Sequence, residues 1–369
     1  METKILETPE IIFRDRNLLP IWEKVQTRQR LDAAEGILLF ESSDFLAVGR
    51  MANWVKLRKT GDHVFFVFNR HVNPTNLCVL SCSFCDFAKK PGDEGAYEMG
   101  IEDVLETLDD ETREVHIVGG HHPTWPFEQY EELLRAIHQR FPAIQIKAFT
   151  AAEFDYFEKR WKVPVAEAIQ RFKAVGLETM PGGGAEVFSD RIHRLLLPGK
   201  AKAERWLEIH RTAHEMGVRS TATLLYGHIE TYSERVKHMA LLRELQDETG
   251  GFLAFIPLEY QIGDTHLVKR QASAIENLKM IATARLFLDN FDHIKAYWIM
   301  MSEEAAGMAL NFGADDMDGT IGKELIAHAA KAKSPVGVAR ERLVRLIKDA
   351  GKVPVERDAT YQVVKIYDN

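Results

Sequence analysis

The cysteines of this sequence are the residues whose type and spacing most clearly point to chemistry. Cys78, Cys82 and Cys85 are the only three in the chain, and their spacing is C-x3-C-x2-C. Thiolates spaced this closely in a compact loop must lie near one another, which indicates that they bind a common group between them. Three thiolates can hold three irons of a [4Fe–4S] cluster. The fourth iron would then lack a protein ligand and would be open to a small molecule.

Other interpretations of the cysteines are weaker but stay open at this point. A structural zinc site uses four ligands, so His71 or His121 would have to supply the fourth. A disulfide framework does not suit an odd number of cysteines in a long chain. Three unrelated buried cysteines would have no reason to cluster within eight residues.

The overall composition is that of an ordinary globular protein. The chain has 369 residues, of which 46% are hydrophobic and 28% charged, and a net charge of −8. The negative charge argues against a nucleic-acid surface. Residues 1–10 lack a signal-peptide core, and no apolar run approaches the ~20 residues of a membrane span. Three free cysteines without a secretion signal fit a reducing cytoplasm. We therefore expect a cytoplasmic protein without nucleic-acid or membrane partners, whose oligomeric state stays open.

The pattern of apolar residues predicts the elements that must position the cysteines. Residues 1–60 are predicted to form a mostly helical extension, with helices over 17–30 and 36–57. Apolar runs and amphipathic helices then alternate. The predicted strands are 61–73, 115–118, 144–149, 177–180, 218–225, 252–256, 293–299 and 311–313.

This alternation favours an α/β fold with a parallel sheet. Eight units over ~250 residues favour a closed TIM-type (β/α)8 barrel. An open doubly wound sheet is the alternative. The barrel is predicted to span residues 61–333, and residues 334–369 to form an extension packed on it. That extension has a predicted helix over 337–350 and a predicted strand over 361–367.

The functional face of such a barrel lies at the carboxyl ends of its strands. Gly119-Gly120 and the Gly182–Gly184 run follow predicted strands, and glycines there let a ligand approach the backbone closely. Glycine pairs after strands also serve simply as tight turns. Glu186 suits ribose hydroxyls, because a carboxylate accepts two hydrogen bonds, although it could also be a solvated loop residue. Other loops at this face are predicted at 150–153, 226–230, 257–259 and, after the last strand, 313–316.

The cysteine spacing, with Phe84 before the last cysteine, resembles the signature of the radical S-adenosylmethionine (radical SAM) enzymes. Over nearly its full length the chain also resembles the aminodeoxyfutalosine synthase family of that superfamily. The stretches that carry this resemblance are 71–87, 90–97, 115–123, 147–151, 181–186, 198–200, 225–231, 245–251 and 313–320. The resemblance implies a barrel of the radical SAM kind. It also implies a [4Fe–4S] cluster whose open iron binds SAM, and a reductant such as flavodoxin or ferredoxin.

The resemblance also implies a reaction. Members of the family add the 5′-deoxyadenosyl radical to 3-[(1-carboxyvinyl)oxy]benzoate. The adduct rearranges and loses a carboxylate to give 6-amino-6-deoxyfutalosine, an intermediate of menaquinone biosynthesis, so SAM is a consumed co-substrate. The related dehypoxanthine futalosine cyclase and the deazaflavin cofactor synthases are alternatives. A non-catalytic Fe–S electron carrier and a zinc-stabilised binding protein are alternatives of another class.

A small aromatic dicarboxylate substrate needs cationic or hydrogen-bonding partners. We accordingly expect three sets of site residues. The catalytic set, with the cysteines as metal ligands, is Cys78, Cys82, Cys85, His122, Tyr226 and His228. The cofactor-binding set is Phe84, Gly119, Gly120, Gly182, Gly183, Gly184 and Glu186, and the substrate-binding set is Thr150, Arg194 and Thr221. The histidines could each be structural instead, and Arg194 could be a helix-surface charge.

Overall fold

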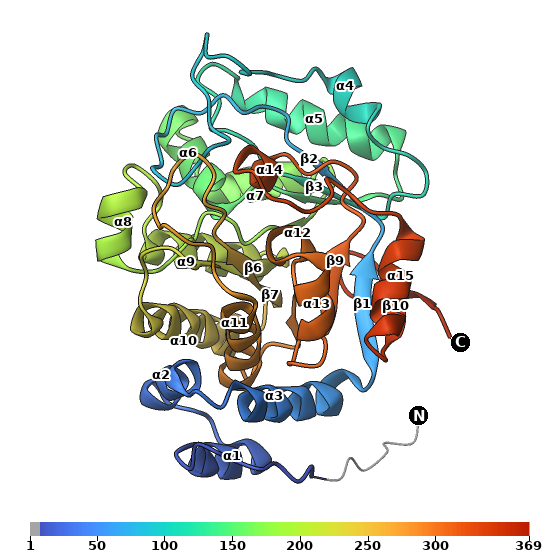
Figure 1. Cartoon of the computed structure of the whole chain (residues 1–369). Helices are drawn as coiled ribbons and strands as arrows, with labels where there is room; N and C mark the ends of the chain where they lie inside the picture. The colour runs from blue at the N-terminus through green and yellow to red at the C-terminus, as the bar shows by residue number, and fades with distance from the viewer. Residues whose placement is uncertain (1–7, 369) are drawn as a thin grey trace.

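The computed structural model describes residues 8–368. Its N-terminal helices are α1 (Leu18–Gln26), α2 (Ala33–Glu41) and α3 (Phe45–Thr60), which lie together at one end of the molecule (Figure 1). The single helix predicted over 36–57 is thus divided between α2 and α3. The Ser42 hydroxyl accepts a hydrogen bond from the Asp44 backbone, and the Asp44 carboxylate accepts one from Arg14. Such side-chain bonds to the backbone compete with a continuing helix.

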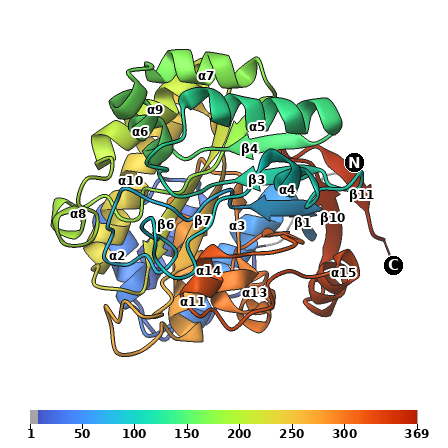
Figure 2. The ribbon, with the colours of Figure 1, turned by 90° about the horizontal axis from the view of Figure 1, so that it is seen from above.

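The barrel is built from one curled parallel sheet and a second, smaller sheet. The first has seven strands in sequence order. They are β2 (Asn69–Val72), β3 (Glu114–Ile117), β4 (Gln145–Ala148), β5 (Leu177–Met180), β6 (Arg219–Tyr226), β7 (Phe252–Glu259) and β8 (His293–Ile294). Viewed from above, the strands lie inside a ring of helices (Figure 2).

The predicted first strand, residues 61–73, is divided between the two sheets. Its first part is β1 (His63–Val67), which pairs in parallel with β9 (Asp316–Gly319), and its second part is β2, which pairs with β3. A bridge between Lys295 and Asp316 joins the end of β8 to β9. Because β1 runs directly into β2, the eight strand positions form a ring. The predicted barrel is therefore confirmed.

Most of the helices that follow these strands cover the outside of the ring, while α12 (Trp298–Met301) and α14 (Ile326–Ala329) contribute residues to a cavity at its mouth. The outer helices are α4 (Ile101–Leu105), α5 (Phe127–Arg140), α6 (Ala151–Trp161), α7 (Val165–Lys173), α8 (Asp190–Leu196), α9 (Ala203–Glu215), α10 (Tyr232–Thr249), α11 (Ala274–Phe287) and α13 (Glu303–Ala309). Capping boxes begin α6 at Thr150 and α10 at Thr231, where the side chain of the cap and a glutamate three residues on satisfy free backbone N–H groups. No helix within residues 8–368 is long and apolar enough to cross a membrane.

The end of the barrel differs from the prediction. The strand predicted over 311–313 is wrong, because those residues turn after α13 and the strand β9 begins only at Asp316. Gly313 has φ +108°, and the Arg285 side chain occupies the space that a side chain there would need. The loop at 313–316 therefore precedes the strand instead of following it, and Asp318 comes close to the functional face. The strand predicted over 293–299 is also shorter, since only His293 and Ile294 pair.

The C-terminal extension completes the second sheet. It contains α15 (Arg340–Asp349), β10 (Val353–Arg357) and β11 (Val363–Ile366), and the strand order is β11-β10-β1-β9. The sequence did not predict β10, which pairs in parallel with β1. From the end of β10, Arg357 Nε donates to the Asp316 carboxylate at 2.7 Å, and both residues are buried. The domain boundaries at residues 60 and 333 stay a prediction.

Candidate active site

The loop that carries the cysteines is fixed by polar contacts from both sides. The Asn76 side chain accepts a hydrogen bond from the backbone of Tyr97 at 2.8 Å. Lys90 Nζ donates to the carbonyl oxygens of Cys78 at 2.8 Å and Leu80 at 2.7 Å. The positively charged Lys90 thus ties the end of the loop back to its beginning, which gives the loop a defined shape without regular secondary structure.

The three thiols suit a cluster of cationic irons. Cys78 is buried and Cys82 and Cys85 are half-buried, and the backbone N–H of Cys85 donates to the carbonyl of Cys82 at 3.2 Å. Burial raises the pKa of the Cys82 thiol to about 11 and also raises that of Cys85. Thiolates are therefore costly here unless a cation offsets them, and iron ions do so. Among residues 8–368 no three or more His, Cys, Asp or Glu side chains are grouped closely enough to hold one metal ion.

The glycine pair after β3 lies directly against this loop. The backbone N–H of Gly120 donates to the carbonyl of Thr75 at 2.9 Å. A Cβ at position 120 would lie 2.2 Å from the Leu77 carbonyl oxygen, and one at Gly119 would lie 3.1 Å from that of Thr75. These glycines are needed because the backbone of the cysteine loop passes too close for a side chain.

Replacing Gly120 with alanine should therefore push the cysteine loop away from β3. Overpacking of this kind costs about 1–3 kcal/mol. We expect G120A to bind less iron and sulfide after reconstitution and to unfold at a lower urea concentration. Gly307 on α13 is the matched control, because nothing lies within 4 Å of a Cβ built there. A G120A protein with the iron content of G307A would show that the close packing does not position the thiols.

A cavity of about 290 Å³ lies between the cysteine loop and the carboxyl ends of the strands. It brings together nine of the residues that the sequence predicts for the site. They are Phe84, Cys85, Gly119, Thr150, Gly182, Gly183, Gly184, Glu186 and Thr221. Cys78, Cys82, Gly120, His122, Arg194, Tyr226 and His228 are not among the described residues that line it.

The glycine run after β5 packs against the middle of β6. The backbone N–H of Gly182 donates to the Thr221 hydroxyl at 3.0 Å, and its carbonyl accepts from the Thr223 hydroxyl at 2.7 Å. A Cβ at Gly182 would lie 2.5 Å from the Thr221 carbonyl oxygen, and Gly184 has φ +86°. Close packing and a left-handed turn both require glycine here. The Thr221 hydroxyl is therefore engaged in holding the glycine run.

Glu186 projects into the cavity together with a lysine that the sequence did not single out. Its carboxylate lies 2.7 Å from Lys200 Nζ, and both side chains are largely buried. Lys200 Nζ lies 5.4 Å from the centroid of the Phe84 ring, so a positive charge stands beside the aromatic residue of the cysteine motif. An ion pair at the edge of the cavity can hold polar groups of a ligand in a fixed orientation.

Glu153 is a second cavity residue outside the predicted sets. Its carboxylate accepts hydrogen bonds from the backbone and the hydroxyl of Thr150, at 2.7 and 2.8 Å, and from the backbone of Gly119 at 3.3 Å. Burial raises the pKa of the Glu153 carboxyl from 4.5 to about 7. Glu153 belongs to the loop 150–153 predicted at the functional face, but its capping-box spacing after Thr150 indicates a helix start and not a role in the site.

The raised pKa of Glu153 predicts a pH effect on stability. Between pH 4.5 and about 7 the folded protein retains a proton that the unfolded chain releases, so this carboxyl makes the free energy of unfolding fall as pH rises. The full effect is about 3 kcal/mol. Urea unfolding of the cofactor-free protein at pH 5 and pH 8 should show a smaller fall for E153Q than for wild type. The exposed Glu178→Gln variant should behave as wild type. Equal pH dependence in all three proteins would contradict the prediction.

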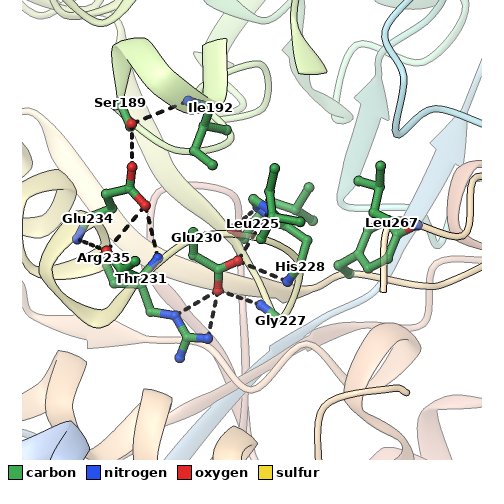
Figure 3. Close-up of polar contacts among 12 residues, drawn as sticks. Ser189, Ile192, Leu225, Gly227, His228, Glu230, Thr231, Glu234, Arg235 and Leu267 are labelled. Carbon is green, nitrogen blue, oxygen red and sulfur yellow. Dashed lines mark hydrogen bonds and ion pairs between the residues drawn. The ribbon is translucent and has the colours of Figure 1, made fainter. Parts of the chain in front are cut away.

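Four of the predicted residues that do not line the cavity have other surroundings. His228 Nε2 lies 3.1 Å from the Leu225 carbonyl, and the Glu230 carboxylate accepts from the His228 backbone at 2.9 Å (Figure 3). The buried Tyr226 hydroxyl donates to the Asn277 side chain. His122 Nε2 lies 2.9 Å from the carboxylate of Glu98, while Arg194 is exposed on α8. Their roles in catalysis and substrate binding stay predictions.

The chain is similar to known proteins over nearly its whole length. Residues 72–242 match the radical SAM superfamily, and residues 249–369 match the CofH/MqnC C-terminal region. The chain is 44% identical to the aminodeoxyfutalosine synthase of Thermus thermophilus, over 96% of this chain and 98% of that protein. Identity to the enzyme of the same name from Streptomyces coelicolor is 40%, over 94% of both chains. Identity to the cyclic dehypoxanthine futalosine synthase of S. coelicolor is 37%, over 96% of this chain and 90% of that protein.

Solved structures support the fold. Methylornithine synthase (PylB) superposes with a TM-score of 0.73 at 16% identity, covering 90% of this chain and 97% of that one. The FeFe-hydrogenase maturase HydG from Carboxydothermus hydrogenoformans gives 0.71 at 15% identity, covering 94% and 80%. At these sequence identities the structural similarity shows the fold alone.

Proposed function

This chain is a radical SAM enzyme of the group that contains aminodeoxyfutalosine synthase, and we propose that it converts 3-[(1-carboxyvinyl)oxy]benzoate and SAM to 6-amino-6-deoxyfutalosine. The observation that carries the proposal is the similarity to two proteins of that name over nearly the whole chain. It exceeds the similarity to the cyclase, at 44% and 40% against 37% identity. The product would feed menaquinone biosynthesis.

The cofactors are a [4Fe–4S] cluster and SAM, and together they supply a 5′-deoxyadenosyl radical. Cys78, Cys82 and Cys85 would hold the cluster, since they are the only thiols and stand in one fixed loop. The Gly182–Gly184 run and Glu186 would bind SAM. The glycines leave room for close approach, and Glu186 can accept hydrogen bonds from ribose hydroxyls.

The protein must also bring the alkene of the substrate to the reacting carbon and keep water away. The cavity wall suits this task, because it contains apolar side chains of several elements. They include Val118, Leu225, Ile256, Leu258 and Met300. Most polar side chains of the cavity are already engaged, as Glu186 is with Lys200 and Glu153 with Thr150. A protein such as flavodoxin or ferredoxin would reduce the cluster, and the cytoplasm is the proposed location.

An anaerobic assay tests the proposal. The reconstituted enzyme is given SAM, dithionite and 3-[(1-carboxyvinyl)oxy]benzoate, and the products are read by mass spectrometry. We expect methionine and an adenosyl adduct that has lost a carboxylate, with none in a C85S control. Methionine with free 5′-deoxyadenosine alone would reject this substrate while keeping the radical SAM chemistry.

The cyclase is a second candidate, because residues 249–369 match the C-terminal region named for the CofH and MqnC proteins. A cyclase would release 5′-deoxyadenosine from its own nucleoside-derived substrate and would leave the enol ether unchanged. The same mass-spectrometric assay, with both substrates supplied in turn, separates the two functions.

A further inference from the structure

Three polar side chains form a row inside the barrel, below the loops of the active site. His71 on β2, His116 on β3 and Lys147 on β4 are paired in register, one beside the other on neighbouring strands. All three line the cavity. The interior of a barrel is usually filled by branched apolar side chains. A row of three basic residues there indicates a binding surface.

The two histidines contact each other and leave one polar atom without a partner. His116 Nδ1 lies 3.3 Å from His71 Nε2, so one ring nitrogen donates to the other. His116 Nε2 is buried and has no hydrogen-bond partner among residues 8–368. Burial lowers the pKa of both imidazoles, and the neighbouring His71 further lowers that of His116. A buried donor or acceptor without a partner is costly, so a ligand group that satisfied it would gain affinity.

The cations around the histidines are already paired with acids. Three ion pairs lie on the surrounding strands, each joining one cation to one acid: Lys147–Glu114 at 3.0 Å, Lys295–Asp318 at 2.9 Å and Arg357–Asp316 at 2.7 Å. From the C-terminal segment, Glu324 also faces the cavity, and its carboxylate accepts hydrogen bonds from the backbone of Ala327. An anion that binds beside His71, His116 and Lys147, at the floor of the cavity, therefore needs a new positive charge. The histidines are the groups that can provide it by protonation.

This inference rests on the proposed function and assigns one end of its substrate. We propose that His71 and His116, with Lys147 beside them, bind the ring carboxylate of an aromatic acid at the floor of the cavity, and that the histidine pair takes up one proton as the anion binds. The carboxylate accepts hydrogen bonds from the protonated imidazole and from Lys147 Nζ. The row lies within the strands, whereas the cysteines lie in a loop beyond their ends, so the ring substituent remote from the carboxylate would face the cluster.

The test compares two probes that cannot react because they lack the alkene. These are 3-methoxybenzoate and its uncharged analogue 3-methoxybenzamide, titrated calorimetrically into the anaerobic cluster-containing enzyme. We expect the wild type to bind the acid about 10- to 100-fold more tightly than the amide, as charge-assisted hydrogen bonds would give. Titrations in two buffers of different ionisation enthalpy should show uptake of about one proton.

The variants H71Q and H116Q should each lose the preference for the acid and the proton uptake. His138→Gln, an exposed position on α5, should keep both. Iron content and thermal stability show whether each variant is folded, and a misfolded H71Q leaves H116Q as the decisive variant. Equal affinities of wild type for the two probes, or an H116Q protein that keeps the preference and the uptake, would overturn the subsite.

The two proposals fail separately. An enzyme that prefers the acid but forms no adenosyl adduct with the enol ether would keep the carboxylate subsite and lose the proposed substrate. An enzyme that forms the adduct but binds both probes equally would keep the function and lose the subsite.

Discussion

Replacing Cys85 with serine should reduce SAM cleavage to the level of the cluster-free protein. Cys85 is the one cysteine of the three that lines the cavity at the strand ends, in a loop fixed by Lys90 and Asn76. A serine hydroxyl is not deprotonated under the conditions in which a thiolate binds iron, so one iron of the cluster would lose its ligand. Iron and sulfide content, visible absorption and the release of methionine after reduction would measure the effect.

Ser83 provides the matched control within the same loop. It is exposed, and its backbone N–H donates to the carbonyl of Leu196 without help from the side chain. We expect S83A to retain both the cluster and SAM cleavage. A C85S enzyme with normal iron content and normal methionine release would show that Cys85 is not a ligand.

Replacing Arg357 with methionine should cost about 3–5 kcal/mol of stability, because it leaves the buried Asp316 carboxylate with only the more distant Lys295, at 3.9 Å. Arg357 is 1% exposed and Asp316 is fully buried, and the guanidinium also lies 4.1 Å from the centroid of the Tyr361 ring. Loss of the cation therefore removes a charge partner and a packing contact at once. Urea unfolding of the cofactor-free protein, followed by circular dichroism, would give the change.

A second substitution separates the charge effect from the packing effect. Changing Asp316 to asparagine in the R357M background removes the stranded negative charge, so the double variant should recover part of the lost stability. Arg345→Met is the control, since that side chain is 75% exposed on α15. If R357M unfolds at the same urea concentration as R345M, the buried ion pair does not hold the extension to the barrel.

The sequence predicted the strands that have a continuous apolar face and missed those that do not. The runs that became β3 to β7 stand between clear helices, so the alternation placed them within about one to three residues. β10 reads Val-Pro-Val-Glu-Arg, and a proline with two charges suggests a loop. β10 forms a strand because it pairs with the edge of β1, and this long-range pairing cannot be predicted from the local sequence.

The site was predictable to the extent that it consists of loops. Cysteines and glycines have few alternative roles at such spacings, and most of them now surround one cavity. His116 and Lys147 were missed because a polar residue inside a short strand normally faces solvent. Only the register of β2, β3 and β4 shows that these side chains stand beside His71 inside the barrel. Tyr226 ends β6 and His228 follows it, as site residues often do; their side chains contact Asn277 and the Leu225 carbonyl, and their roles in the site stay predictions.

The division of the first strand has a consequence for how the protein matures. β1 ends at Val67, yet its neighbours β9 and β10 begin at Asp316 and Val353. The contact between Asn69 and Thr320 spans 251 residues of sequence. Pairings of such range form slowly, because the chain between them must first be ordered. On the ribosome the edge of β1 therefore stays open until residues 353–357 have been synthesised. The cysteine loop directly follows β2, which continues from β1. Iron and sulfide should therefore enter after translation, when β9 and β10 have paired with β1.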